Sequence, residues 1–167
     1  MPSPDLTIRR ATVADCATIL AFIRDLAEYE RLAHEVVADV AALEATLFGA
    51  RPAAEVLIAE VAAAPVGFAL FFQSYSTFLG KPGLYLEDLF VRPTARGHGV
   101  GRALMSALAR LCVQRSYGRF EWSVLDWNKP ALDFYATLGA KPQSEWTVQR
   151  LTGAPLAALA NGWPTAL

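Results

Sequence analysis

The chain of 167 residues has the length of one domain, because about 100–200 residues usually form a single hydrophobic core. Its 15 basic and 16 acidic side chains give a net charge near −1, so no strong field draws it to nucleic-acid phosphates or anionic membranes. Hydrophobic residues make up 54% of the chain and charged residues 19%, which excludes a disordered protein and is compatible with a buried subunit interface. The composition predicts a single folded domain, residues 1–167, that does not bind nucleic acid.

The sequence contains neither a candidate membrane span nor a metal-binding motif. The longest uncharged apolar stretch, Val61–Phe72, is broken by Pro65 and Gly67 and is shorter than the ~18–20 residues that cross a bilayer. The N-terminal sequence MPSPDLTIRR has no apolar signal core, so we expect a cytoplasmic protein with no membrane partner. Cys16 and Cys112 are too few for a disulfide framework or a zinc site, so we expect no metal and predict that both are buried apolar side chains.

The first predicted elements are a strand, Leu6–Arg10, and a helix that begins shortly after it. Thr12, with Asp15 three residues later, resembles a capping box at a helix start. Apolar residues then recur every three or four positions, which is typical of one buried helix face. These residues are Cys16, Ile19, Leu20, Ile23, Leu26 and Ala27. Continuing the same spacing leads to Glu30, where we expect the helix to end.

The middle of the chain changes from helical to strand periodicity. A second helix is predicted at Asp39–Phe48, with Gly49 in the left-handed position that often follows a helix. Two segments rich in β-branched and aromatic residues, Val56–Val61 and Val66–Tyr75, flank a short Ala-Pro turn and predict a hairpin. Gly83–Val91 is predicted to be the next strand.

The last elements complete an alternating order of strands and helices. Helical periodicity returns at Gly99–Arg115, and Phe120–Val124 has the composition of a strand. Asn128 is expected to cap a short helix that ends before Gly139, and Trp146–Leu151 is predicted to be a final strand. This order predicts an α/β (α+β) fold, with a mixed sheet flanked by helices and one parallel crossover through the helix at Gly99–Arg115.

Two acidic residues interrupt the apolar strand Gly83–Val91. Because strand side chains alternate, we expect Glu87 and Asp88 to point to opposite faces, each among apolar neighbours. Burial raises the pKa of a carboxyl group, which is one way to bring a general base toward neutral pH. The structural alternative is that an arginine or backbone N–H groups neutralise each acid. The pair indicates where an active site is to be sought.

A glycine-rich loop follows this strand and leads into the next helix. Its residues are Arg96, Gly97, His98, Gly99, Val100 and Gly101. A loop with little side-chain bulk at a helix start exposes backbone N–H groups to an anion such as a diphosphate, and Arg96 can add charged contacts. A dinucleotide-binding loop would need a third glycine at position 102, where this chain has Arg102. It would also need an acidic residue about twenty positions later, and Glu121 meets that requirement. A nicotinamide-dependent oxidoreductase is therefore the less favoured alternative.

Four other segments occur in register with the loop: Ala11–Cys16, Tyr85–Val91, Trp127–Pro130 and Phe134–Tyr135. Together with the R-x-x-G-x-G pattern, they resemble the diamine branch (spermidine/spermine-type and thialysine) of the GNAT superfamily of N-acetyltransferases. The resemblance covers about residues 6–159, nearly the whole chain. It implies the GNAT fold, acetyl-CoA as cofactor and direct acetyl transfer to a primary amine of a small diamine, polyamine or diamino acid.

The resemblance also implies roles for particular residues. Glu87 corresponds to a base that acts through water, and Tyr135 to the acid that protonates the departing thiolate. From its spacing alone, Tyr135 shares a helix face with Leu132 and Leu138, as a core tyrosine does. Coenzyme A contacts are implied for Leu89, Phe90, Val91, Arg96, Gly97, His98, Gly99, Val100, Gly101 and Asn128. An amine pocket is implied for Tyr29, Glu30, Glu87, Asp88 and Trp127.

Ordinary structural roles remain open for several of these residues. Asn128 also suits a helix cap, and Tyr29 and Trp127 also suit simple packing. Neither His34 nor His98 is expected to be catalytic.

The sequence departs from the animal members of the branch in ways that affect the substrate. The region around residues 51–60 and the turn at 62–65 are shorter, and the tail after Leu151 lacks charges. A short diamine, a diamino acid or a thialysine-like amine therefore fits as well as a long polyamine. The resemblance and the apolar composition together imply a homodimer. Two other functions remain open: an acyltransferase that acts on a protein or peptide amine, and a non-catalytic regulatory module that binds coenzyme A.

Overall fold

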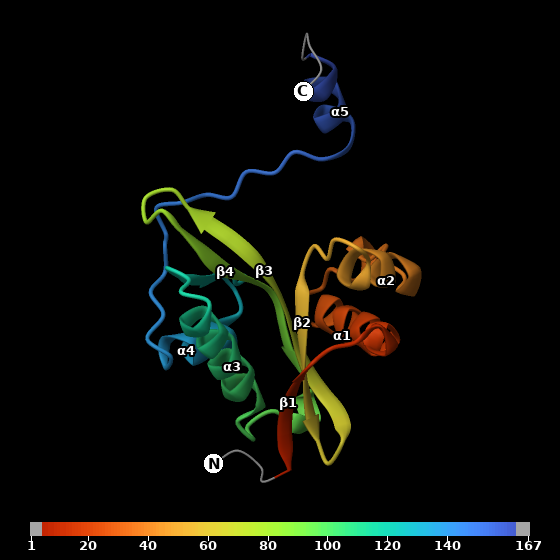
Figure 1. Ribbon diagram of the computed structural model, residues 1–167, viewed down its shortest axis with the longest axis vertical. Coiled ribbons are helices and arrows are strands. Elements are labelled where there is room, and N and C mark those ends of the chain that lie inside the picture. Colours follow the sequence, from red (N-terminus) through yellow and green to blue (C-terminus); the bar gives the residue numbers. More distant parts are fainter. Residues whose placement is uncertain (1–4, 163–167) are drawn as a thin grey trace. The chain divides into compact units, whose positions relative to one another are not determined.

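The computed structural model describes residues 5–162, and the chain forms two compact units, Met1–Ser123 and Val124–Leu167. The first unit contains strands β1 (Leu6–Arg10), β2 (Glu55–Val61), β3 (Ala64–Ser76), β4 (Lys81–Val91) and β5 (Phe120–Trp122), and helices α1 (Cys16–Tyr29), α2 (Val40–Phe48) and α3 (Val100–Gln114) (Figure 1). Short 3-10 turns lie at Val13–Asp15, Ala33–Glu35 and Pro93–Ala95. The second unit contains α4 (Lys129–Ala136) and α5 (Gly153–Asn161).

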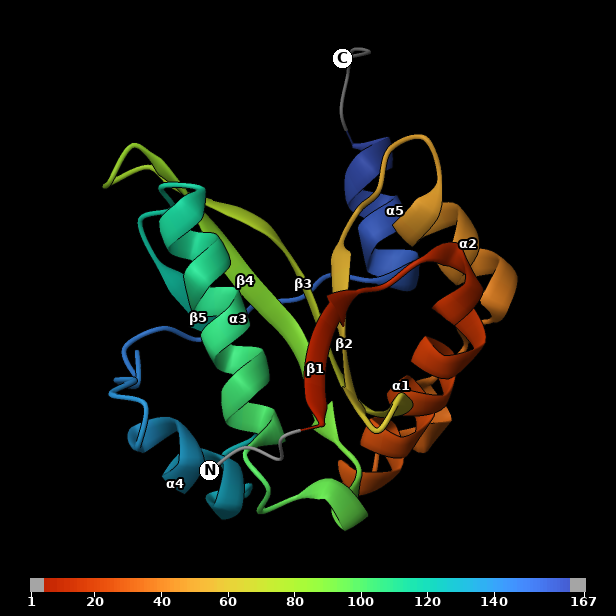
Figure 2. The same ribbon diagram turned by 60° about the horizontal axis from the view of Figure 1, so that its bottom comes forward.

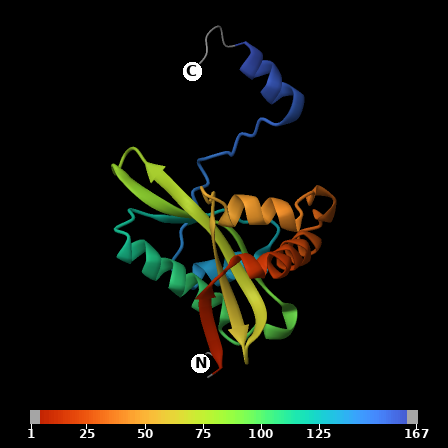
Figure 3. The ribbon, with the colours of Figure 1, turned by 45° about the vertical axis from the view of Figure 1, so that its right-hand side comes forward.

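The first unit is built on one mixed sheet with the strand order β1-β2-β3-β4-β5. The pairs from β1 to β4 are antiparallel, and β4 and β5 are parallel. Helix α3 makes the connection from β4 to β5, which confirms the predicted parallel crossover. Helices α1 and α2 cover one face of the sheet and α3 covers the other (Figures 2 and 3). The predicted mixed sheet flanked by helices is thus confirmed.

Apolar side chains fill the space between α1, α2 and the sheet. The rings of Phe22 and Phe68 stack with centroids 5.4 Å apart, and the ring centroid of Phe90 lies 6.2 Å from that of Phe22. The buried members of this cluster are Cys16, Ile19, Leu20, Phe22, Leu43, Leu47, Val56, Ile58, Phe68 and Phe90. On the other face, α3 buries Val100, Leu104, Met105, Leu108 and Cys112. Both cysteines are buried and free, as predicted.

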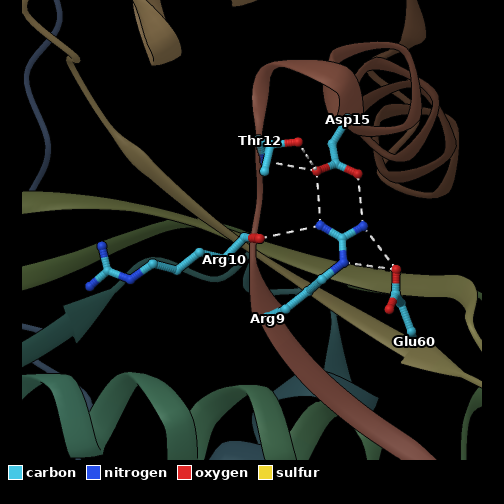
Figure 4. A network of polar contacts seen from close by, with 5 residues as sticks. All are labelled: Arg9, Arg10, Thr12, Asp15 and Glu60. Carbon is cyan, nitrogen blue, oxygen red and sulfur yellow. Dashed lines mark hydrogen bonds and ion pairs between the residues drawn. The ribbon is translucent and has the colours of Figure 1, made fainter.

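A network of ion pairs fixes the start of α1 against the edge of the sheet (Figure 4). The guanidinium of Arg9 donates to both carboxylate oxygens of Asp15 at 2.8 and 2.9 Å, and to Glu60 at 2.9 Å. Asp15 also accepts hydrogen bonds from the backbone and hydroxyl of Thr12, which confirms the predicted capping box. The Arg9 contact lowers the pKa of Asp15 to about 2. This charged network ties β1, β2 and α1 together.

The structure corrects the prediction for the end of α2. Gly49 follows the helix as expected, but its φ of −71° and ψ of −172° are extended rather than left-handed. A Cβ at this position would collide with the carbonyl oxygen of Ala45. Glycine is therefore needed here for a close backbone approach. In contrast, Gly139 has the positive φ of +83° that suits the end of the short helix α4.

The predicted strand at Trp146–Leu151 is wrong. This segment is irregular and exposed, with 76% of Trp146 and 77% of Val148 accessible. Alternating apolar and polar residues form a strand only where a neighbouring strand supplies hydrogen bonds, and within residues 5–162 this segment has none. The tail that follows contains α5, which the sequence pattern did not resolve.

Candidate active site

A β-bulge in β4 is the central feature of the candidate site. Asp88 pairs with Leu70 of β3 and Leu86 pairs with Phe71, so Glu87 is the additional residue without a partner in this register. A bulge bends its strand and redirects the side chains beside it. Glu87 is exposed, so the prediction that both acids are buried is wrong for this residue. The bulge breaks the regular alternation from which that prediction was made.

Asp88 is the acid that the fold partly buries. Burial, together with the negative charges of Glu87 and Glu30, raises its pKa to about 6. Glu30 follows the last residue of α1, is half-buried and has a pKa that is also raised by burial. We call Glu30, Glu87 and Asp88 the acidic cluster. It combines residues from α1 and β4, which are far apart in the sequence.

The sheet opens beside this cluster. β5 pairs with β4 only at Leu84–Leu86, so in the described part of the chain the residues from Glu87 to Val91 have a strand neighbour on one side alone. On the side where β5 has ended, the backbone of residues 87–91 can therefore pair with a ligand, except for the carbonyl oxygen of Val91, which accepts a hydrogen bond from Arg96. Leu89, Phe90 and Val91, which were expected to contact coenzyme A, lie in this open segment.

The glycine-rich loop has the geometry of an anion-binding site. Gly97 and Gly99 have φ values of +79° and +80°, and Gly99 directly precedes the first residue of α3. A Cβ at Gly97 would have open space around it, so the loop is not packed against its own chain there. Within residues 5–162, no hydrogen bond uses the backbone N–H groups of Gly97, His98, Gly99, Val100 and Gly101. These donors and the positive end of α3 can hold a diphosphate.

Arg96 lies at the beginning of this loop and contacts both neighbouring elements. Its Nε donates to the carbonyl oxygen of Val91 at 2.9 Å. Its guanidinium carbon lies 4.9 Å from the ring centroid of Tyr29 and 5.7 Å from that of Phe90. The structure thus brings Tyr29, from the end of α1, beside the predicted diphosphate loop.

Three of the predicted site residues belong to the second unit. Asn128 is buried and its side-chain oxygen accepts a hydrogen bond from the backbone of Ala131 at 3.3 Å, so it caps α4 as predicted. Tyr135 lies on α4 with its ring 5.4 Å from that of Phe134, and it is half-buried. Trp127 is 50% exposed. Their roles toward cofactor or substrate remain predictions.

A model of the GNAT acetyltransferase family matches residues 21–140 of the chain. The chain belongs to this family. GNAT acetyltransferases take the acetyl group from acetyl-CoA, so this enzyme is an N-acetyltransferase with acetyl-CoA as donor.

Relatives with curated functions are similar over nearly the whole acetyltransferase. The thialysine N-ε-acetyltransferase of Sus scrofa is 40% identical over 165 residues, which cover 92% of this chain and 96% of the relative. The L-ornithine N5-acetyltransferase of Arabidopsis thaliana is 34% identical over 197 residues, covering 91% and 86% of the two chains. A spermidine/spermine N(1)-acetyltransferase-like protein of Homo sapiens is 31% identical over 80% of this chain and 20% of its own length. These matches confirm the branch to which the sequence was compared.

Solved structures support the same fold. An integron cassette protein from the mobile metagenome of V. cholerae has a TM-score of 0.80 and 25% identity, covering 96% of this chain and all of that one. An aminoglycoside acetyltransferase from an uncultured soil metagenomic sample has a TM-score of 0.71 and 21% identity, covering 90% and 96%. The second likeness concerns the fold alone.

Other features of the acetyltransferase complete the description of the site. His98 and His34 are both exposed. Within residues 5–162, no group of three His, Cys, Asp or Glu side chains could hold a metal ion. No helix in the same range is long and apolar enough to cross a bilayer. Sequence reasoning missed the bulge at Glu87 and the stacking of Arg96 on Tyr29, because neither has a local sequence signal.

Proposed function

We propose that this acetyltransferase acetylates a primary amine of a small diamine, polyamine or diamino acid. The observation that carries the proposal is the acidic cluster of Glu30, Glu87 and Asp88 beside the open segment of β4. Such a cluster attracts a substrate with a second cationic nitrogen. The relatives named for thialysine and L-ornithine support an amine of this size.

We assign the diphosphate of coenzyme A to the loop from Arg96 to Gly101. The residues fit this group because five successive backbone N–H groups are unused within residues 5–162 and the loop leaves space at Gly97. The backbone of Leu89, Phe90 and Val91 would pair with the pantetheine arm, and we include Asn128 as a further contact. Bound acetyl-CoA supplies the acetyl group as a reactive thioester.

We assign proton removal from the amine to Glu87. Primary amines are protonated at neutral pH, so a proton must leave before the nitrogen can attack. Glu87 is exposed at the bulge, which allows it to accept this proton through a water molecule. The backbone N–H groups of residues 89–91 would stabilise negative charge on the carbonyl oxygen. We assign protonation of the departing sulfur to Tyr135.

The remaining acids would hold the distal end of the amine. Glu30 and Asp88 carry negative charge that a second ammonium group can compensate, and Tyr29 and Trp127 would add aromatic contacts. The pKa of Asp88, about 6, means that the cluster gains charge as the pH rises toward neutrality. A cationic substrate lowers that pKa by stabilising the carboxylate, so amine binding and deprotonation of Asp88 favour each other.

We infer that residues 1–167 act as one acetyltransferase domain, since the family model spans the boundary between the two units. We also propose a homodimer, which the resemblance to the diamine branch and the apolar composition of the chain support. Sedimentation tests it: a dimer is expected at micromolar concentration, and a monomer there contradicts it. A cytoplasmic location stays a prediction from the sequence.

A panel of amines tests the proposed substrate class. Release of the coenzyme A thiol from acetyl-CoA would be followed with diamines, polyamines, diamino acids, thialysine, a lysine-containing peptide and a simple monoamine. We expect the highest kcat/KM with an amine that carries a second cationic group. Turnover of the peptide alone would favour an acyltransferase acting on proteins. Binding of coenzyme A without turnover of any amine would favour a regulatory module.

The proposed acid has its own test. Tyr135→Phe should lower kcat by about 10²-fold or more while the KM for both substrates changes little, because the hydroxyl acts only on the leaving group. Thr137→Val, on the same segment, serves as the control variant. An unchanged kcat in Tyr135→Phe would remove this role.

A further inference from the structure

Two arginines follow β4, and both lie over aromatic rings of α1. The guanidinium carbon of Arg92 is 5.0 Å from the ring centroid of Phe22, and that of Arg96 is 4.9 Å from the ring centroid of Tyr29. Phe22 and Tyr29 are seven residues apart, which is about two turns of an α-helix, so they share one face of α1. This face therefore contacts the connection between β4 and α3 at two points.

The two arginines differ in how their charge is balanced. Arg92 lies 3.8 Å from the carboxylate of Asp25 and also donates to the carbonyl oxygen of Pro65 at 3.4 Å. In the described part of the chain, no carboxylate forms an ion pair with Arg96. Its partners are the Tyr29 ring, the Phe90 ring at 5.7 Å and the carbonyl oxygen of Val91. These contacts orient the guanidinium without neutralising its charge.

We propose that Tyr29 is a positioning residue for the binding of coenzyme A. Its ring holds the guanidinium of Arg96 in the orientation that binds the diphosphate. The inference rests on the proposed location of the diphosphate at the Arg96–Gly101 loop. An aromatic face attracts a guanidinium and restricts its rotamers, and unlike a carboxylate it leaves the full positive charge for an anion. Ordering a long side chain before binding reduces the entropy lost on association. The ring expected in the amine pocket thus also serves the cofactor.

The consequence concerns the ring of Tyr29 rather than its hydroxyl. Tyr29→Phe keeps an aromatic face under Arg96, whereas Tyr29→Leu keeps apolar bulk and removes the face. Because Tyr29 is 37% exposed at the end of α1, both variants should fold. Thermal unfolding of each variant checks this before binding is measured.

Calorimetric titration of coenzyme A, without amine, tests the inference on the full chain. We expect Tyr29→Leu to raise the Kd about two- to fivefold, and Tyr29→Phe to leave it within twofold. In an Arg96→Ala background, Tyr29→Leu should have no further effect, because the residue acts through Arg96. Titration with acetyl-pantetheine, which lacks the diphosphate, should give the same affinity for Tyr29→Leu and the unchanged chain.

The same variants separate failure of the inference from failure of the proposed function. If Arg96→Ala leaves the Kd of coenzyme A unchanged, the assignment of the diphosphate to this loop is wrong. If Arg96→Ala weakens binding and Tyr29→Leu does not, only the inference is overturned. It is likewise overturned if Tyr29→Leu raises the Kd of coenzyme A by the same factor in the unchanged chain and in the Arg96→Ala background. Tyr29 would then act independently of Arg96.

Discussion

Two adjacent segments of β4 have different neighbours. Residues 84–86, the closed segment, pair with β3 on one side and β5 on the other. In residues 87–91, the open segment, Glu87 is the unpaired bulge residue and residues 88–91 pair with β3 alone. Leu84 and Leu86 are 0% and 2% exposed, but Glu87 is exposed and Asp88 is half-buried. One strand thus contributes both to the core and to the candidate site.

The bulge at Glu87 marks the transition between the two segments. A regular strand with partners on both sides has no free backbone groups, so it cannot bind a ligand through its main chain. Where β5 ends, the backbone of β4 becomes available and acidic side chains replace leucines. The open segment thus gives up the strand pairing and apolar burial that stabilise the closed segment, and it gains backbone groups and acidic side chains that can bind a ligand.

The largest effect is expected for Glu87→Gln in the open segment. We expect kcat/KM to fall about 10²–10⁴-fold, because a positioned general base contributes on this order. The loss should be greatest at low pH, where more of the amine is protonated. Because Glu87 is exposed, the free energy of unfolding should change by less than about 0.5 kcal/mol.

The matched control is Glu28→Gln, an exposed glutamate on α1. It should leave both the rate and the stability unchanged. Full activity of Glu87→Gln at every pH would contradict the assignment of this residue as the base.

The next largest effect concerns stability in the closed segment. Leu86→Ala should lower the free energy of unfolding by about 2–5 kcal/mol, since it removes a fully buried side chain and leaves a cavity. Leu89→Ala, in the open segment, should cost less because Leu89 is only half-buried. Urea unfolding of the two variants measures the difference. Equal losses would show that the two segments are equally packed.

Much of the first unit could be predicted from periodicity. The bounds predicted for β1 match the structure, and the bounds of α2 and α3 differ from prediction by at most one residue. Helix α1 ends one residue before the predicted Glu30, but it begins at Cys16, after a 3-10 turn at Val13–Asp15, rather than directly after the capping residue Thr12. These elements each bury one regular face, so their spacing is recorded directly in the sequence. The glycine loop was predictable for a similar reason, because positive φ at Gly97 and Gly99 favours glycine.

Features that depend on distant pairing could not be predicted in this way. The bulge at Glu87 arises from the register between β3 and β4, and the local sequence of β4 does not encode its position. Trp146–Leu151 has the alternation of a strand but no strand neighbour within residues 5–162. The stacking of Arg96 on Tyr29 joins residues far apart in the sequence.

The carboxyl group of Asp88, in the open segment, should make the free energy of unfolding depend on pH. Its pKa rises from 3.8 to about 6 on folding, so the folded state disfavours the charged form. The resulting cost is absent below about pH 4, grows between about pH 4 and 6, and is complete above that range. Asp88→Asn should therefore raise the free energy of unfolding by about 1–3 kcal/mol at pH 7.5 and change it little at pH 4.

Denaturant unfolding at several pH values measures this effect. Asp126→Asn, at an exposed position of the second unit, is the control and should show no such pH dependence. A stability gain in Asp88→Asn that is the same at pH 4 and pH 7.5 would mean that the charge of Asp88 is not its cause.

The smallest effect separates backbone strain from ligand binding. Gly97, in the loop after the open segment, and Gly80, in the turn before β4, have φ values of +79° and +59°, and a Cβ at either would meet nothing within 4 Å. Gly97→Ala and Gly80→Ala should therefore each cost about 1–2 kcal/mol of stability from strain alone. Only Gly97→Ala should also weaken coenzyme A, because its Cβ keeps phosphate oxygens away from the backbone N–H groups. Thermal unfolding and calorimetric titration of both variants provide the two measurements. If both variants bind coenzyme A with the affinity of the unchanged chain, the loop does not hold the diphosphate. The proposed coenzyme A site beside the open segment of β4 would then be wrong.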